Sequence, residues 1–185
     1  SMSRLTGQEL FSIVDGHGGI FMPAHAFTPY KSFYGSSCTS LRQIFDEESF
    51  QKIPSIELGL SADAMMASRL SELRGKSFTS NSDAHSLMKM GREYNIFEME
   101  DSSFDEVLKA LKNVDGRRIK ANYGLNPRLG KYHRTFCLVC NKILDGSPPV
   151  LKCPVSDRHR VVMGVRDRLE TIADLEEPDM TGRPP

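Results

Sequence analysis

The protein has 185 residues, with 24 Lys and Arg against 24 Asp and Glu, four cysteines and no tryptophan. This length suits one domain with a small appendage and allows a sizeable core. The composition excludes a collagen, a disulfide-rich scaffold and a disordered chain. No apolar run reaches the roughly 18 residues of a membrane span, and no signal-peptide pattern opens the chain. We therefore expect a cytoplasmic protein with no membrane partner.

The zero net charge conceals a split along the chain. Residues 1–116 hold 11 basic and 16 acidic residues, whereas residues 117–185 hold 13 basic and 8 acidic ones. Six basic residues and no acidic residue lie between positions 117 and 134. Such asymmetry indicates a segment that faces a polyanion, and a solvated loop is the alternative.

Hydrophobic patterning predicts alternating strands and helices in the first part of the chain. In chain order we expect a strand at 18–25, a short helix at 39–45, a strand at 53–60, a helix at 64–73, and strands at 76–80 and 94–99. Ser103 and Glu106 form a capping-box pattern for a helix that runs to Val114. Strands that alternate with helices favour an α/β fold of parallel β/α units.

The amino-acid composition changes after residue 116. We expect an α/β body at 1–116, a basic linker at 117–130 and a cysteine-containing module at 131–175 that ends in a helix over 163–175. Residues 176–185 contain three prolines and are expected to form a flexible tail.

Four polar residues follow or end the predicted strands: His25, Glu57, Asp83 and His85. In β/α barrels the carboxyl ends of the strands converge on one face, where catalytic groups collect. Imidazoles and carboxylates are suitable ligands for Zn, Mn or Fe. A metal cluster is therefore one hypothesis, and a set of separate hydrogen-bonded structural residues is the other.

The second constellation is Cys137-x2-Cys140, followed by Cys153. Two thiolates on one short turn can reach the same ion, and the third arrives from a return turn. Serine, which is a poor zinc ligand, stands at position 156, where a second short pair would place a cysteine. His159, Asp157 or His133 could supply the fourth ligand, and His159 is favoured. The spacing predicts a structural zinc site, against three free thiols as the alternative.

Four sequence motifs together resemble the PHP-domain phosphoesterases: Pro23-Ala24-His25-Ala26-Phe27-Thr28-Pro29, Glu57-Leu58-Gly59-Leu60-Ser61, Asn81-Ser82-Asp83-Ala84-His85-Ser86 and Gly91-Arg92-Glu93. Gly130-Lys131-Tyr132-His133, followed by the cysteine segment, narrows the resemblance to the endonuclease Q group. The resemblance implies a distorted PHP-type β/α barrel with a metal cluster and a small zinc-binding module. It also implies metal-dependent cleavage of DNA near deaminated bases or abasic sites.

The resemblance assigns roles to individual residues. It implies that His25, Asp83 and His85 bind the catalytic Zn, Mn or Fe ions, with Glu57 near the site. Cys137, Cys140 and Cys153 match three zinc ligands. Independently of the resemblance, Arg92 is expected to pair with a phosphate or with Glu57, and a surface salt bridge is the equal alternative.

The N-terminal part of the chain lacks one motif of the PHP family. PHP enzymes open with a His-x-His pair, and none of the five histidines of this chain forms one. We therefore expect the chain to correspond to the C-terminal half of such a barrel. Exposed strand edges would then pair with a missing N-terminal half or with a second copy, and the chain alone would have weak or no nuclease activity.

Three functions remain open at this point. The first is a DNA-repair endonuclease or its C-terminal half, and the others are a non-catalytic zinc-dependent DNA-binding or interaction module and a PHP-type small-molecule phosphatase. The endonuclease and the DNA-binding module require DNA as a partner, whereas an interaction module would bind another protein. The residues expected to contact DNA are Arg117, Arg118, Lys120, Arg128, Lys131, Tyr132 and Arg134.

Overall fold

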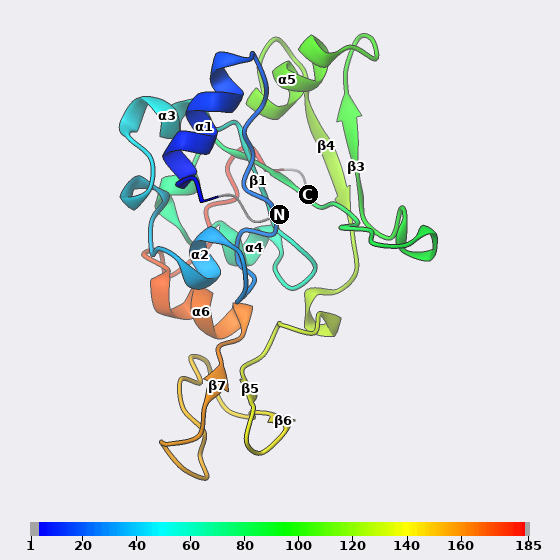
Figure 1. Ribbon diagram of the computed structural model, residues 1–185. Coiled ribbons are helices and arrows are strands. Elements are labelled where there is room, and N and C mark those ends of the chain that lie inside the picture. Colours follow the sequence, from blue (N-terminus) through cyan, green and yellow to red (C-terminus); the bar gives the residue numbers. More distant parts are fainter. Residues whose placement is uncertain (1–3, 184–185) are drawn as a thin grey trace.

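The computed structural model describes residues 4–183. Figure 1 shows a larger α/β body with a smaller module below it. The helices are α1 (Gly7–Gly16), α2 (Phe33–Ser36), α3 (Glu47–Lys52), α4 (Ala64–Ala67), α5 (Phe104–Lys112) and α6 (Val165–Ile172). The strands are β1 (Ser55–Glu57), β2 (Ser77–Thr79), β3 (Tyr94–Glu98) and β4 (Arg118–Tyr123) in the body, and β5 (Phe136–Cys137), β6 (Lys142–Ile143) and β7 (Val161–Val162) in the module. Short 3-10 helices are η1 (Leu41–Gln43), η2 (Ser71–Leu73), η3 (Leu87–Lys89) and η4 (Pro127–Leu129).

The centre of the body is the parallel pair β1–β2, which confirms a strand in each of the ranges 53–60 and 76–80. The segment expected as a strand at 18–25 runs beside β1 but is not itself a strand. Only two backbone hydrogen bonds join this segment to β1: the Glu57 N–H donates to the Pro23 carbonyl and the Ala26 N–H donates to the Glu57 carbonyl. The chain then turns at His25, whose φ is 33°, so a regular ladder does not form.

The helix expected at 64–73 is interrupted. It becomes α4 and η2 because the C-terminal part of the chain takes its carbonyls. The Ser68 carbonyl accepts from the Asp179 N–H, and the Arg69 carbonyl accepts from the Asp174 N–H. A longer helix needs both acceptors for its own N–H groups. The expected helix at 39–45 is likewise reduced to η1.

Strands β3 and β4 form a separate antiparallel pair, with α5 packed against them. The strand predicted at 94–99 is β3, and six residues of the expected basic linker form β4. Helix α5 begins as predicted, because the Ser103 hydroxyl accepts from the Glu106 N–H. The second half of the capping box does not form, since the Glu106 carboxylate accepts from the Glu100 N–H instead.

Helix α1 was not predicted from the sequence, although its start carries a local signal. Thr6 and Glu9 form a complete capping box, the arrangement that satisfies two N–H groups at a helix start. Phe11 is the buried residue of this helix and packs edge-on against Phe21 and Phe45. The helix therefore belongs to the body core.

The body and the module have separate hydrophobic clusters. The body cluster includes Phe27, Tyr34 and Phe78, all almost fully buried. The module cluster consists of Cys137, Leu144 and Cys153, with partly buried neighbours. Helix α6, within the predicted range 163–175, follows the module and returns to the body core. Within residues 4–183, no helix combines the length and apolar character that a membrane crossing requires.

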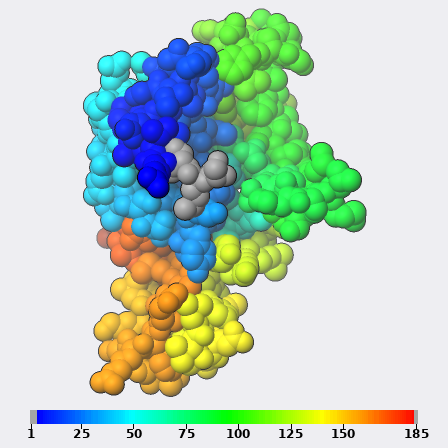
Figure 2. All heavy atoms as spheres, in the orientation of Figure 1, coloured from blue at the N-terminus to red at the C-terminus, as the bar shows by residue number. Residues whose placement is uncertain are grey.

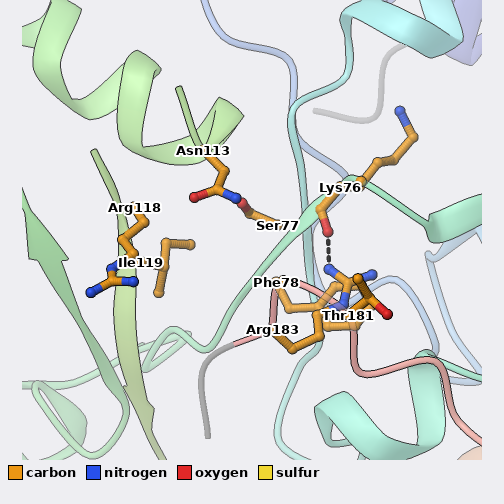
Figure 3. A pocket seen from close by; sticks show the side chains of 10 residues that line it. Lys76, Ser77, Phe78, Asn113, Arg118, Ile119, Thr181 and Arg183 are labelled. Carbon is orange, nitrogen blue, oxygen red and sulfur yellow. Dashed lines mark hydrogen bonds between the residues drawn. The ribbon is translucent and has the colours of Figure 1, made fainter. Parts of the chain in front are cut away.

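The C-terminal segment expected to be a flexible tail binds the body as far as residue 183, and residues 184–185 lie outside the described part. Arg74 and Asp179 form an ion pair of 2.6 Å. Figure 3 shows Arg183 beside Phe78 in a cavity of about 60 Å³. Its guanidinium lies 3.6 Å from the ring centroid and donates to the backbone carbonyl of Lys76. These contacts explain how the segment reaches the carbonyls that interrupt the expected helix.

Candidate metal centre and nucleic-acid interface

The module brings four metal-ligating side chains together. Cys137 ends β5, and a tight turn returns the Cys140 N–H to the Cys137 Sγ at 3.3 Å. The Cys140 Sγ lies 3.7 Å from the Cys153 Sγ and 3.3 Å from the His159 Nδ1. All four ligand atoms lie within 4.8 Å of one another. Three sulfurs and one imidazole nitrogen at this spacing could hold a metal ion, and they match the tetrahedral ligand sets of zinc.

The geometry separates the three candidates for the fourth ligand. His159 lies within this group, whereas the Asp157 carboxylate pairs with Lys152. His133 is buried elsewhere, with its Nδ1 3.0 Å from the Ser61 carbonyl. Across residues 4–183, no second group of three or more metal-ligating side chains lies so close together.

The three thiols differ in acidity. Burial alone would raise the pKa of Cys137 and of Cys153, but backbone N–H groups that point at their sulfurs bring both pKa values below the usual range. The pKa of Cys140 is raised to about 11, because its sulfur is buried and faces the other two. A bound cation would favour the thiolate form of all three cysteines.

The module is tied to α6 through Asp167, which is completely buried. Its Oδ2 accepts from the backbone N–H and the hydroxyl of Thr135, and its Oδ1 accepts from the Val150 N–H. Gly164 lies against the backbone of Arg134 so closely that a Cβ would stand 2.2 Å from a carbonyl carbon. This junction, which sequence reasoning missed, fixes the cysteine-bearing strands relative to the body.

The expected catalytic residues lie on the body, where Glu57 has a clear structural role. Its carboxylate is buried and accepts from the backbone N–H groups of His25 and of Gly59. Gly59 has a φ of 73° and approaches His25 closely, so a side chain there would be strained and crowded. Glu57 therefore shapes the loop that presents His25.

Asp83 and His85 follow β2 on the surface, where 79% of the His85 side chain is exposed. The His85 Nδ1 lies 2.8 Å from the Asp83 carbonyl oxygen. That oxygen only accepts, so the Nδ1 carries the proton and the Nε2 is the available ligand atom. Together with His25, the two residues stay predicted metal ligands.

The neighbouring motif Gly91-Arg92-Glu93 splits into two roles. Arg92 donates from its Nε to the Ser82 carbonyl at 2.8 Å. Glu93 is buried, and its Oε1 accepts from the Leu125 N–H at 3.2 Å. Burial raises the pKa of Glu93, with a smaller contribution from the charge of Glu57. The sequence indicated Glu93 only as part of a motif that could line the site, because its burial depends on a contact with Leu125, 32 residues later.

The basic segment is only partly free to face DNA. Three of the expected arginines are held by acidic side chains: Arg117 by Glu100 and Glu106, Arg118 by Glu98 and Arg134 by Asp145. In contrast, Lys120, Arg128 and Lys131 are exposed and form no ion pair within the described part of the chain. The last three are therefore the stronger candidates for phosphate contacts.

A cavity of about 470 Å³ lies where the module meets the body. Aromatic and apolar side chains line most of it, with Lys131 and Arg134 at its edge. The rings of Tyr30 and Tyr132 meet edge to face at 5.7 Å, and the Lys131 ammonium lies 5.3 Å from the Tyr132 ring centroid. Tyr132 is thus both a packing residue and part of a surface with positive charge.

A family profile described as PHP-associated matches residues 63–115. Two curated relatives match most of the chain. The uncharacterized protein YqxK of Bacillus subtilis is 46% identical over 93% of this chain and 43% of its own length. The uncharacterized protein MJ0043 of Methanocaldococcus jannaschii is 40% identical over 87% of this chain and 21% of its own length.

Two solved structures match 98% of the chain at 39% identity. One is the lesion-specific endonuclease PfuEndoQ from Pyrococcus furiosus, with a TM-score of 0.82 over 45% of that protein. The other is endonuclease Q in complex with a 27-mer duplex that carries an abasic lesion at the active site, with a TM-score of 0.81 over 46% of that protein. The resemblance to the endonuclease Q group is confirmed. The mixed α/β fold is thus shared with endonuclease Q, of which this chain spans less than half the length.

Proposed function

We propose that this chain is the C-terminal part of the catalytic barrel, together with the zinc-binding module, of a metal-dependent DNA-repair endonuclease. Its substrate would be DNA with deaminated or abasic sites, cleaved in the phosphodiester backbone. The observation that carries the proposal is the match over 98% of the chain to endonuclease Q bound to a duplex with an abasic lesion. The parallel pair β1–β2 and the side chains that follow its strands are consistent with part of a β/α barrel.

In this proposal, His25, Asp83 and His85 bind the catalytic ions. Zn, Mn or Fe would polarise the phosphodiester and activate a water molecule. Glu57 holds the His25 loop through two backbone N–H groups. The hydrogen bond from the His85 Nδ1 to the Asp83 carbonyl leaves the Nε2 as the ligand atom. Cys137, Cys140, Cys153 and His159 would hold a structural zinc ion.

The proposed division of the chain has a body at 1–116, a connecting segment at 117–130, whose strand β4 pairs with β3 of the body, and the zinc module at 131–175, whose helix α6 packs on the body core. The exposed Lys120, Arg128 and Lys131 would contact the DNA backbone. Residues 20–26 run along β1 on the side away from β2. In the described part of the chain, no regular strand pairs with β1 on that side. An N-terminal half, or a second copy of the chain, would pair there.

A non-catalytic, zinc-dependent DNA-binding module is the second candidate. The absence of a His-x-His pair from the sequence favours it for this chain alone. Both candidates predict DNA binding. They differ in whether the predicted metal ligands His25, Asp83 and His85 take part in cleavage. A phosphatase of small phosphate esters would not require the module or its exposed basic residues.

The test compares two reactions of the purified chain in the presence of Mn²⁺ or Mg²⁺. One substrate is a labelled duplex with a uracil, hypoxanthine or abasic site, and the other is a simple phosphomonoester. We expect binding of the damaged duplexes, weak or no cleavage by the chain alone, and no hydrolysis of the phosphomonoester. Rapid phosphomonoester hydrolysis would favour the phosphatase, and failure to bind damaged DNA would refute the proposal.

A further inference from the structure

The two most exposed large apolar side chains of the described residues, Met88 and Leu87, are neighbours on one projecting loop, residues 84–91, which we call the finger. Met88 is 94% exposed, Leu87 is 85% exposed and Met90 is 68% exposed. Figure 1 shows this segment reaching outward from the start of β3, and Figure 2 shows it as the green projection at the side of the molecule. Neighbouring apolar side chains that are exposed to this extent are typical of an interaction site.

The finger is held at its base and has no support at its tip. The Ser82 hydroxyl donates to the Glu93 carbonyl, and the Arg92 Nε donates to the Ser82 carbonyl. Within the tip, the backbone bonds of η3 are local ones, from Lys89 to Ser86 and from Met90 to Leu87. The base of the finger is therefore anchored to the body, and its apolar tip projects away from it.

Charge and position favour DNA as the occupant. Residues 84–92 contain His85, Lys89 and Arg92 and no acidic residue. The finger begins directly after the proposed metal ligand Asp83 and includes His85, so it would lie beside the phosphodiester that is cleaved. A chain segment that completes the sheet would instead pair beside residues 20–26, on the other side of β1 from β2.

We propose that the finger is a DNA wedge that places Leu87 and Met88 in the gap that an abasic nucleotide leaves in the base stack. Apolar side chains that enter a base step unstack it and kink the duplex. An abasic site has already lost the stacking that must otherwise be broken, so insertion there costs least. Lys89 binds a flanking phosphate. This inference rests on the proposed function and adds a means of recognising the lesion.

The test uses the double variant Leu87→Ser/Met88→Ser and two duplexes that differ only in one abasic site. Fluorescence anisotropy should show about a hundredfold weaker binding to the abasic duplex, which follows from losing the burial of two apolar side chains. Binding to the intact duplex should hardly change. A 2-aminopurine opposite the abasic site should brighten with the wild-type chain, as it is unstacked, and less with the variant.

A matched control replaces two exposed apolar residues of α1, Leu10→Ser/Ile13→Ser. This control should bind both duplexes as the wild type does. Lys89→Gln should weaken binding to both duplexes and reduce the salt dependence. Unchanged melting temperatures would show that the exposed substitutions leave the fold intact.

Three outcomes would overturn the wedge. The first is that the finger variant binds the abasic duplex as tightly as the wild type does. The second is an equal loss of affinity for both duplexes. The third is that the variant differs from the wild type only in self-association, measured by light scattering. The last result would identify a second copy as the occupant. If the wild-type chain binds no damaged DNA, the proposed function fails as well, so the two failures are distinguishable.

Discussion

Glu57, a predicted member of the metal cluster, also has a structural role in the fold. The sequence places it at the end of a strand beside the candidate metal ligands. In the structure its buried carboxylate accepts from two backbone N–H groups, those of His25 and Gly59. A buried carboxylate with two donors stabilises the loop around it, and the loop carries the candidate ligand His25.

Replacing Glu57 with glutamine should destabilise the protein. The Glu57→Gln amide can accept one of the two N–H groups and places its own NH₂ against the other. We expect a loss of about 2 kcal/mol in the free energy of unfolding, measured by urea denaturation. Glu98→Gln, which breaks a half-exposed ion pair with Arg118, should cost less than about 1 kcal/mol. Equal losses in the two variants would contradict the assigned role.

At the scale of residues, the sequence predicted the sites whose members lie close together in the chain. Cys137-x2-Cys140 can form a two-sulfur turn wherever it lies, so the cluster could be predicted, including His159 as the favoured fourth residue. The partners of Glu57 and Glu93 could not be predicted. Each depends on a contact with a residue 32 positions away in the chain, between Glu57 and His25 and between Glu93 and Leu125.

At the scale of elements, α5 and the β3–β4 pair form a unit around Glu106. Its carboxylate accepts from the Glu100 N–H, from Lys109 at 2.7 Å and from Arg117 at 2.8 Å. These donors, with the Glu100 N–H as the largest contribution, lower the pKa of Glu106 to about 2. The ionised carboxylate therefore joins the helix to both flanking strands.

The lowered pKa predicts how stability changes with pH. Because the pKa of Glu106 is about 2 in the folded protein and about 4.3 when unfolded, its contribution is complete above about pH 5 and is lost as pH falls towards 2. Melting temperatures between about pH 6 and 3 should fall more steeply for the wild type than for Glu106→Gln. Other carboxylates such as Asp179 titrate in both proteins and cancel in the comparison. Parallel pH profiles would contradict the prediction.

Elements shaped by distant contacts were not predicted, and those with local signals were predicted only in part. Helix α5 starts at Ser103 as its cap indicates. The expected helix at 64–73 was wrong as one element, because residues more than 100 positions later bind its carbonyls. Helix α1 was missed although Thr6 and Glu9 form a capping box, a signal that could have been found.

At the scale of the whole molecule, the body and the module are stabilised separately. The body has a large core of its own, while the module has a small cluster that consists mainly of the cysteines. Small modules of this kind depend on their metal for folding. The charge split of the sequence follows the same division, although three arginines expected to contact DNA are held in ion pairs.

Metal removal should therefore unfold the module and leave the body folded. After treatment with a strong chelator, we expect hydrogen exchange to become rapid across residues 136–162, while amides of β1 and β2 stay protected. Cys153→Ser should have the same effect without a chelator, and Cys38→Ser, which changes a cysteine of the body core, should leave the module protected. Loss of protection throughout the chain, or none at all, would contradict independent stabilisation.

The central claim is that this chain recognises damaged DNA, and a binding comparison tests it most directly. The measurement is the affinity of the purified chain for a duplex with one abasic site and for the same duplex intact, over a series of salt concentrations. We expect tighter binding to the abasic duplex and a loss of affinity with salt, because lysines and arginines that contact phosphates release counterions from the DNA. Equal affinity for the two duplexes, or no binding at low salt, would contradict it.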